Sequence, residues 1–438
     1  MADLAIGLGL AVALFPPLTG ADLYLSADRS GILPVNATVI SALSLSSVFG
    51  LILLDGLARD HGRRLCTIYR AAGPPLLAFS LVTVVQLTGG FLPEAYWSDS
   101  GKYIYLPLYT LVLLMFSIGI ASTPTFRQYH RVIFAICLAA ATGSIFVDVF
   151  FPETFSRFDT RPAGFMKDPN YGAATVIVLA LATVDWTRSR TSDMLVWSIA
   201  GSAIVATLSR GGMVLLAVAF LVYSVVVARS GLQLYAKRLS ILLLAIAIVV
   251  PVYSMAHLGT TVYSADNQRA QMLAALLRGD TATVTADPRV KLISGYIDLI
   301  SDRPFLGYGT GFVTSRAWQD DGPHNMYLAL WVENGVVGLS AYVMLLTVCF
   351  SYFRRLGDPR GQVFCISLMI FSFFSHDAIT MRPIVLNLGL LSVMAVFEST
   401  ARREPSRPAP QRQPAVLLHE RKSNARARPP DPLRPLSR

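Results

Sequence analysis

Long hydrophobic runs recur along the chain and are separated by short polar segments. An α-helix needs about 20 mainly apolar residues to cross the roughly 30 Å hydrocarbon core of a bilayer. Runs near this length lie at 4–20, 37–58, 74–92, 103–122, 131–151, 171–187, 193–208, 211–228, 238–256, 332–353, 361–377 and 383–398. The pattern therefore predicts an all-α polytopic membrane protein with about 12 transmembrane helices. The first run lacks the basic start and the cleavage site of a secretory leader, so we expect it to be a retained span.

The composition agrees with this class of protein. Of the 438 residues, 53% are hydrophobic and only 15% are charged, and the mean hydropathy is +0.52. A water-soluble globular protein would hardly stay soluble with these values.

Lys and Arg are unevenly divided between alternate loops. The loops near 59–73, 123–131, 187–192, 229–238 and 354–360 carry 14 of them, whereas those near 21–36, 93–102, 152–170, 209–210 and 377–383 carry 7. Because cytoplasmic loops are enriched in basic residues, the first set and both termini are predicted to be cytoplasmic. The four cysteines then lie in spans or on the cytoplasmic side, and neither a disulfide framework nor a zinc spacing is present.

The sequence divides into an integral membrane domain, 1–398, and a tail, 399–438. The tail holds 10 basic and 3 acidic residues and is rich in Pro and Arg. This composition predicts a disordered cytoplasmic tail that reinforces the orientation, with contact to anionic lipid headgroups as the alternative. Since the tail contributes +7 of the net +10, the basic balance does not indicate nucleic acid as a partner.

One predicted outer loop, about 257–324, is much longer than the others and is a functional candidate. Its segment 266–278 is helix-forming, and a second helix is expected over 287–300, with Asp287 as N-cap and Pro288 at the first helical position. Val290, Ile293, Ile297 and Ile300 share one face of that helix, which predicts that it lies flat on the membrane or packs on the spans. The glycines of "FLGYGTG", 305–311, indicate a turn-rich connector, because no strand–helix–strand unit surrounds them.

Two arginines on the outer side are candidates for binding an anion. Arg210 lies in "LSRGGM", a short break that makes a helical hairpin; the alternative is an interfacial arginine that reaches to water. Arg289 lies in the first turn of its predicted helix, where the helix dipole disfavours a cation unless an anion also binds there. An ordinary surface arginine remains the alternative.

The imidazole of His324, in "DDGPHNMYLALW", is a candidate proton acceptor, because an ordinary imidazole titrates near neutral pH. The alternative is a histidine that caps the next helix. His376 and Asp377, at the outer end of the eleventh span, and Asp148, Lys167 and Asp168 are weaker candidates on the same side.

The predicted membrane interior holds no charged residue at a clear midplane position, which argues against a proton-coupled transporter. Any chemistry is therefore expected at the outer interface. Neither a D-x-D pair nor an H-E-x-x-H motif is present, so no metal site is expected.

Four segments resemble the bacterial O-antigen ligase family, whose relatives include O-antigen and exopolysaccharide polymerases. They are "FMKDPNYGAA" (165–174), "LSRGGM" (208–213), "DPRVKLISGYIDLISDRPFLGYGTGF" (287–312) and "PHNMYLALWVENGVVGLSAY" (323–342). The resemblance covers roughly 160–345. It implies a metal-independent membrane glycosyltransferase of the GT-C type without a cofactor, which uses an undecaprenyl-diphosphate-linked glycan on the periplasmic side of the bacterial inner membrane.

Carried over to this sequence, the resemblance assigns Arg210 and Arg289 to the donor diphosphate and His324 to activation of the acceptor. Asn325, Asp168 and Asn170 belong to the same motifs and are supporting candidates, as are His376 and Asp377. The implied partners are the lipid bilayer and a glycan or lipid A core acceptor, with a chain-length regulator as a further candidate. A single displacement would invert the anomeric centre.

Two enzyme interpretations and one transport interpretation remain open. A ligase would move a finished glycan to its final acceptor, and a polymerase would join lipid-linked repeats. The short second outer loop, 152–170, favours a ligase, whereas the lack of a second histidine next to His324 in the sequence, present in some ligases, weakens that preference. A flippase for lipid-linked sugars is less consistent with the missing midplane charges.

Overall fold

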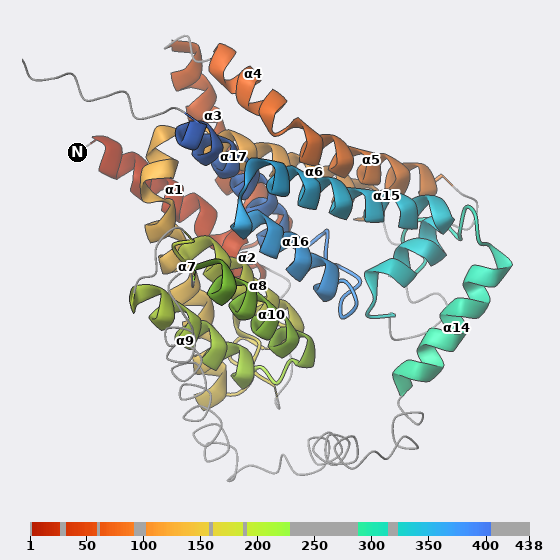
Figure 1. The fold of residues 1–438 in the computed structure, drawn as a ribbon. Helices are drawn as coiled ribbons and strands as arrows, with labels where there is room; N and C mark the ends of the chain where they lie inside the picture. Colours follow the sequence, from red (N-terminus) through yellow and green to blue (C-terminus); the bar gives the residue numbers. More distant parts are fainter. Residues whose placement is uncertain are drawn as a thin grey trace, which may run out of the picture. The chain divides into compact units, whose positions relative to one another are not determined.

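The computed structural model describes residues 2–26, 32–58, 62–91, 102–156, 161–186, 191–227, 288–313 and 323–403. All regular structure in these ranges is helical, and they contain no strand. The helices are α1 (Ala2–Thr19), α2 (Ala21–Leu25), α3 (Ala37–Ala58), α4 (Gly62–Ala71), α5 (Gly73–Gly89), α6 (Lys102–Ala121), α7 (Pro124–Phe150), the short 3₁₀-helix η1 (Gly164–Met166), α8 (Pro169–Thr183), α9 (Thr191–Ala206), α10 (Arg210–Val227), α14 (Pro288–Asp302), α15 (Met326–Leu356), α16 (Pro359–Phe371) and α17 (Arg382–Arg403). Figure 1 shows their arrangement.

Eleven of the twelve predicted spans coincide with helices of the structure: α1, α3, α5 to α10 and α15 to α17. The ninth predicted span, 238–256, lies outside the described residues, as does the helix predicted over 266–278. Within the described residues, three helical segments are long and apolar enough to cross a membrane, namely Pro124–Phe150, Met326–Leu356 and Arg382–Arg402, and shorter apolar helices accompany them. The all-helical class is thus confirmed for this part of the chain, and the count of twelve stays a prediction.

Helix α8 lies at the centre of the packing. Nearly all of its side chains are buried, from Gly172 to Thr183, and α7, α9, α10 and α16 all contact it. Its sequence is apolar all round and rich in small residues, as expected for a helix that is enclosed on every side. The largest fully buried side chains nearby include Trp197 of α9, Tyr223 of α10 and Phe364 of α16.

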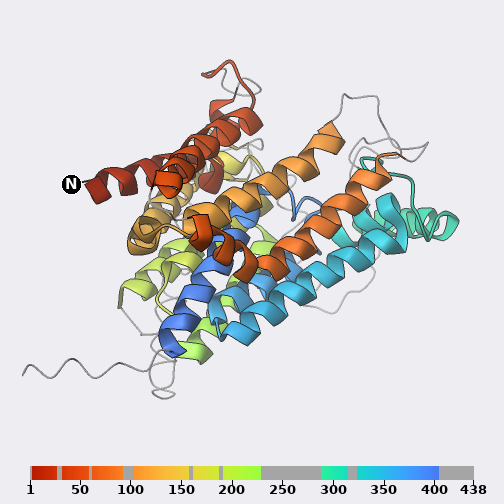
Figure 2. The ribbon, with the colours of Figure 1, turned by 90° about the horizontal axis from the view of Figure 1, so that it is seen from above.

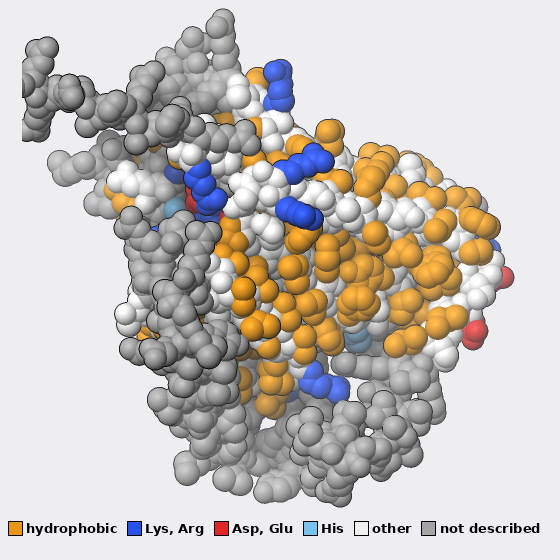
Figure 3. All heavy atoms as spheres, viewed as in Figure 1, with side chains coloured by type: hydrophobic (Ala, Val, Ile, Leu, Met, Phe, Trp, Pro, Cys, Tyr) orange, Lys and Arg blue, Asp and Glu red, His pale blue; other side chains and the backbone are white. Residues whose placement is uncertain are grey.

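The outer surface of the described helices is unusually apolar. Figure 3 shows a broad band of hydrophobic side chains over α15 and α16, with Lys and Arg at its edges. Large exposed apolar side chains include Leu77 and Val84 of α5, Val225 of α10, and Val337 and Val343 of α15. Soluble monomers rarely expose contiguous apolar surface on this scale, whereas lipid tails cover it. The chain is therefore a membrane protein.

Helix α15 is interrupted near its N-terminal end. Gly335 has φ 62° and ψ −162°, a conformation essentially restricted to glycine, so the helix consists of a short first half, 326–334, and a long second half, 336–356. The second half lies beside α5 in Figures 1 and 2. The sequence offered an apolar span at 332–353 but no sign of this break.

The connector 304–313 satisfies the backbone groups that the break leaves free. The amides of Tyr308 and Gly309 donate to the carbonyls of Val332 and Glu333, at 2.9 and 2.8 Å. The amide of Val336 donates to the carbonyl of Pro304 at 2.8 Å. The glycine-rich segment is thus a turn-rich connector, as predicted, and its glycines allow it to approach the broken helix closely.

Helix α14 begins at Pro288, as the sequence predicted, although Asp287, its expected N-cap, lies outside the described residues. Tyr296 and Ile300 are buried against the first half of α15 and the connector, in a small second core with Val313, Ala329 and Val332. Ile293 and Ile297 are 40% and 50% exposed. The isoleucines of the predicted shared face are therefore divided between its two alternatives: Ile300 packs on the protein, and Ile293 and Ile297 remain available to a membrane surface.

The C-terminal helix α17 continues to Arg403, past the boundary expected at residue 398. The chain forms two units, Met1–Phe397 and Glu398–Arg438, and of the second only the helical residues up to Arg403 are described. In that part Arg402 pairs with Glu398 one turn earlier, at 3.7 Å. The rest of the predicted tail lies outside the described residues.

Candidate functional site

Three helices of the candidate site begin in the same unusual way. Lys167, Leu208 and His324 have positive φ angles of 65°, 51° and 44°, and each lies two residues before the first residue of α8, α10 or α15. They are three of the four non-glycine residues with positive φ in the described part of the chain. Such backbone conformations are disfavoured for L-residues and persist only where the surroundings enforce them, often at functional sites.

A polar residue caps each of these three helix starts. Asp168 accepts hydrogen bonds from the amides of Asn170 and Tyr171, at 2.7 and 3.3 Å. Asn325 accepts from the amides of Tyr327 and Leu328, at 3.0 and 3.2 Å. The hydroxyl of Ser209 accepts from the amide of Gly212 at 3.0 Å. These side chains satisfy helix N–H groups that would otherwise lack partners. Asp168 and Asn325, both predicted as supporting residues, are therefore the N-caps of α8 and α15, and their part in any chemistry stays a prediction.

The starts of α8 and α10 are joined directly to each other. Asn170 accepts a hydrogen bond from the hydroxyl of Ser209 at 2.8 Å. Gly212 lies so close to α8 that a Cβ there would be 2.5 Å from the Cβ of Ala173. The "RGG" sequence is thus explained by close approach: a larger residue at this position would push the two helices apart.

The connection between α16 and α17, residues 372–381, meets all three helix starts. Its Ser372 carbonyl accepts from the amide of Met326 of α15 at 2.7 Å. Phe374 lies against Gly211 of α10, where a Cβ would be 2.7 Å from the ring. The hydroxyl of Tyr171 of α8 donates to the Asp377 carboxylate at 2.5 Å. The starts of α8, α10 and α15 and the 372–381 connection, which are far apart in the sequence, thus form one polar cluster.

This connection also brings a second imidazole to His324. The ring centroids of His324 and His376 are 5.7 Å apart, with an angle of 58° between the ring planes. Nε2 of His376 is 3.5 Å from Oδ2 of Asp377. Both histidines are partly buried. His376 thus lies near His324 in space, although the two residues are far apart in the sequence.

The two predicted arginines both lie in the first turn of a helix. Arg210 is the first residue of α10, and its side chain is exposed. Arg289 is the second residue of α14, and its side chain lies outside what the structure describes. Arg210 therefore belongs to the cluster through its neighbours Ser209 and Gly211. How close Arg289 comes to it stays a prediction.

Asp148 organises the loop that precedes α8. Its carboxylate is only 2% exposed and accepts from the amides of Phe155, Ala163 and Gly164 at 2.6, 3.3 and 2.8 Å. A carboxylate with three backbone donors fixes a loop and compensates its own burial. It thereby sets the path of the chain that leads to Lys167 and Asp168.

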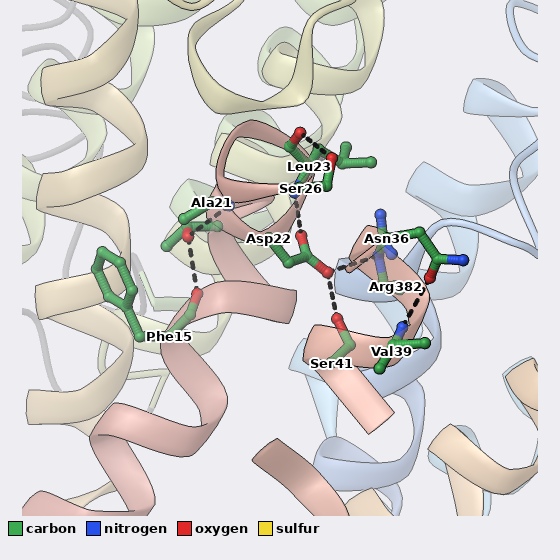
Figure 4. Close-up of polar contacts among 10 residues, drawn as sticks. Phe15, Ala21, Asp22, Leu23, Ser26, Asn36, Val39, Ser41 and Arg382 are labelled. Carbon is green, nitrogen blue, oxygen red and sulfur yellow. Dashed lines mark hydrogen bonds and ion pairs between the residues drawn. The ribbon is translucent and has the colours of Figure 1, made fainter. Parts of the chain in front are cut away.

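The buried ion pair between Asp22 and Arg382, which lies at the end of the 372–381 connection, was not predicted from the sequence. Asp22 of α2 is fully buried, and its carboxylate contacts the Arg382 guanidinium, with an Nε–Oδ2 distance of 3.1 Å, and the Ser41 hydroxyl (Figure 4). Arg382 is the first residue of α17, so the pair ties the end of the 372–381 connection to α2 and α3. Burial raises the pKa of the Asp22 carboxyl above its ordinary value, although Arg382 and Ser41 lower it.

Where side chains are described, no group of three or more His, Cys, Asp or Glu lies together in a way that could hold a metal ion. All four cysteines are free thiols. The polar groups that the helix starts bring together are imidazole, carboxylate, phenol and guanidinium, which suit proton transfer and anion binding.

Residues 194–343 match the sequence model of the family described as O-antigen ligase. The match spans 150 of the 438 residues, from α9 into α15, and includes Arg210, Arg289 and His324. The chain is thus a membrane protein that carries an O-antigen ligase-like region, and the resemblance of its motifs is confirmed there. No curated protein matches the chain.

Proposed function

We propose that this protein transfers a glycan from an undecaprenyl-diphosphate-linked donor to an acceptor hydroxyl in the assembly of a surface polysaccharide. The reaction takes place at the periplasmic face of the bacterial inner membrane, in a GT-C-type protein whose termini are both cytoplasmic. The observation that carries the proposal is the cluster at the starts of α8, α10 and α15. Its imidazole pair and Arg210 lie within or against the region that matches the O-antigen ligase family.

His324 is the proposed base. The acceptor hydroxyl must lose its proton as it attacks the anomeric carbon, and a positioned base contributes about 10²- to 10⁴-fold to the rate of such a step. His324 has a disfavoured positive-φ backbone and lies between Pro323 and the capping Asn325, which supports a fixed position for its imidazole at the start of α15. There it can meet an acceptor that arrives from the aqueous side.

Arg210 and Arg289 are the proposed ligands of the diphosphate. Both occupy the first turn of a helix, where the positive end of the helix dipole disfavours a cation. That placement becomes favourable when an anion binds to the guanidinium and the helix start together. As the anomeric C–O bond breaks, negative charge develops on the leaving diphosphate, and fixed guanidinium groups stabilise it.

The donor lipid determines where the site lies. A polyprenyl chain stays in the bilayer, so its diphosphate is held at the membrane surface, next to apolar helix faces such as those of α10 and α15. A single displacement by the acceptor would invert the anomeric centre. The acceptor is a glycan or a lipid A core, and a chain-length regulator is a candidate partner.

The test is the fate of polysaccharide in cells that lack this protein. Glycans are resolved by length and probed for attachment to undecaprenyl diphosphate. We expect long polymer to accumulate on the lipid while the final acceptor stays bare, which is the result for a ligase. Single lipid-linked repeats without polymer would make it a polymerase instead, and accumulation confined to the cytoplasmic leaflet would contradict glycan transfer in favour of a flippase.

A further inference from the structure

Four residues from three separate segments form a continuous row at the candidate site. Tyr171 of α8 donates to Asp377, and Oδ2 of Asp377 lies 3.5 Å from Nε2 of His376. The rings of His376 and His324 are tilted relative to each other, with centroids 5.7 Å apart. The other ring nitrogen of His376, Nδ1, is buried and makes no hydrogen bond within the described residues. A buried polar atom without a partner destabilises the folded protein. Packing alone does not account for an imidazole there.

We propose that His376 is a positioning residue that accepts the proton from His324 during transfer, and that Asp377 and Tyr171 hold it in place. This inference rests on the proposed function and deepens it. In the step, the acceptor oxygen bonds to the anomeric carbon, and the bond from that carbon to the diphosphate oxygen breaks. The hydroxyl proton passes to His324, then to His376, and from there to periplasmic water.

The separation of the two rings suits this transfer. At 5.7 Å between centroids, the two imidazoles are close enough for one water molecule to carry a proton between them. Two adjacent imidazolium ions would repel each other, so the pair holds a single extra proton. The Asp377 carboxylate lies 3.5 Å from Nε2 of His376 and can attract a positive charge that develops on that ring.

The surrounding charges favour the same direction. The Tyr171 hydroxyl donates to Asp377, which stabilises the carboxylate as an acceptor. Asp168 caps the helix that carries Tyr171, and Arg210 begins the helix that packs on Phe374. The Asp377 carboxylate thus lies on the side of His376 where a positive charge would be stabilised.

The experiment uses the purified full-length protein, reconstituted with membranes of a deletion strain as the source of lipid-linked glycan and acceptor. Initial transfer rates are measured against pH, with and without added imidazole. We expect His376→Ala to lower the rate by about 10- to 100-fold and imidazole to restore part of it. Asp377→Asn should move the acid limb of the pH profile to lower pH, because the carboxylate no longer stabilises the extra proton.

A matched pair of tyrosines separates a role in the row from general disturbance. Tyr171→Phe removes the hydrogen bond to Asp377 and should lower the rate by several-fold. Tyr327→Phe removes a comparable hydrogen bond, 3.0 Å to the carbonyl of Met369, from the first turn of α15 and should leave the rate unchanged. Both substitutions keep the aromatic ring and therefore the packing.

The outcomes distinguish this inference from the proposed function. A His376→Ala variant with the full rate, beside an inactive His324→Ala variant, would overturn the role of His376 and leave glycan transfer intact. A second result would also overturn the proposed role of His376. If His376→Ala loses rate without rescue by imidazole, and Asp377→Asn shows no shift of its pH profile, His376 has a structural role only. Full activity of His324→Ala would instead remove the proposed base itself.

Discussion

Replacing Arg382 by Met should leave the carboxylate of Asp22 buried without its cation. Asp22 is fully buried, and Arg382 is only 13% exposed. Breaking a buried pair of this kind by removing one partner typically costs about 3–5 kcal/mol, because the remaining charge has neither water nor a counter-ion. The variant can reduce that cost by protonating Asp22, which makes the effect dependent on pH.

The sign and size of that dependence follow from the pKa of Asp22. Its pKa is already above the ordinary value because of burial, and removal of Arg382 raises the pKa further, since the guanidinium lowers it. The folded variant then binds a proton that the unfolded chain releases, so stability falls as pH rises from the unfolded pKa toward the folded pKa. While the folded carboxyl keeps its proton, this cost grows by about 1.4 kcal/mol for each pH unit above the ordinary aspartate pKa of about 3.9, so it is larger at pH 7 than at pH 5.

The assay is thermal unfolding of the purified protein in detergent at pH 5 and pH 7. We expect Arg382→Met to be clearly less stable than the unchanged protein at pH 7 and much closer to it at pH 5. The double variant Asp22→Asn/Arg382→Met should recover most of the loss, because a neutral amide keeps the contacts with Ser41 and Leu23 without a buried charge. Arg402→Met is the control: it removes an exposed pair with Glu398 and should change stability by less than about 1 kcal/mol at either pH.

Two results would refute this reasoning. One is a stability deficit of Arg382→Met that is the same at pH 5 and pH 7, since the deficit would then not come from the ionisation of Asp22. The other is a double variant no more stable than the single one. In either case the ion pair would not be what holds α2 to the start of α17.

Substitutions at three further positions test the scaffold of the site. Gly335→Ala should prevent stable folding, because a φ of 62° strains Ala by about 1–3 kcal/mol and the new Cβ would lie 2.0 Å from the carbonyl oxygen of Phe305. The yield of monodisperse protein in detergent measures this effect. A normal yield would contradict the break in α15. Asn325→Ala should cost about 1 kcal/mol and Asn325→Asp almost nothing, as judged by melting temperature, because only the first loses the cap of α15; equal melting temperatures would argue against that cap. Asp148→Ala should lower the melting temperature more than Asn325→Ala or Asn325→Asp does, because three backbone amides lose their acceptor. An unchanged melting temperature would show that the loop does not depend on this carboxylate.

The hydrophobic pattern predicted the helices well, because a run of about 20 apolar residues has few alternatives to a membrane helix. The local rules also held at α14, where Pro288 begins the helix, and at the hairpin tip before Arg210. These features are determined by residues adjacent in the sequence, so the sequence alone is enough to predict them.

The contacts that define the site could not be predicted in this way. His376 meets His324, and Asp22 meets Arg382, across long stretches of chain, and no local signal marks such pairs. Tyr171 lies in the 165–174 motif, but its partner Asp377 lies in the distant 372–381 connection between α16 and α17. The break at Gly335 lies inside an apolar run and could not be predicted from it. The Asn334-Gly335 step interrupts the helix only because the 304–313 connector packs against it and bonds to the free backbone groups.

The measurement that tests the central claim most directly is glycan transfer by His324→Ala in a strain that lacks the native gene. The variant protein is first shown to be folded and present in the membrane at the normal level, and the surface and lipid-linked glycans are then compared. We predict that transfer is abolished and that lipid-linked glycan accumulates as in the deletion strain. Normal surface glycan in this variant would contradict the assignment of His324 as the base and, with it, the proposed site.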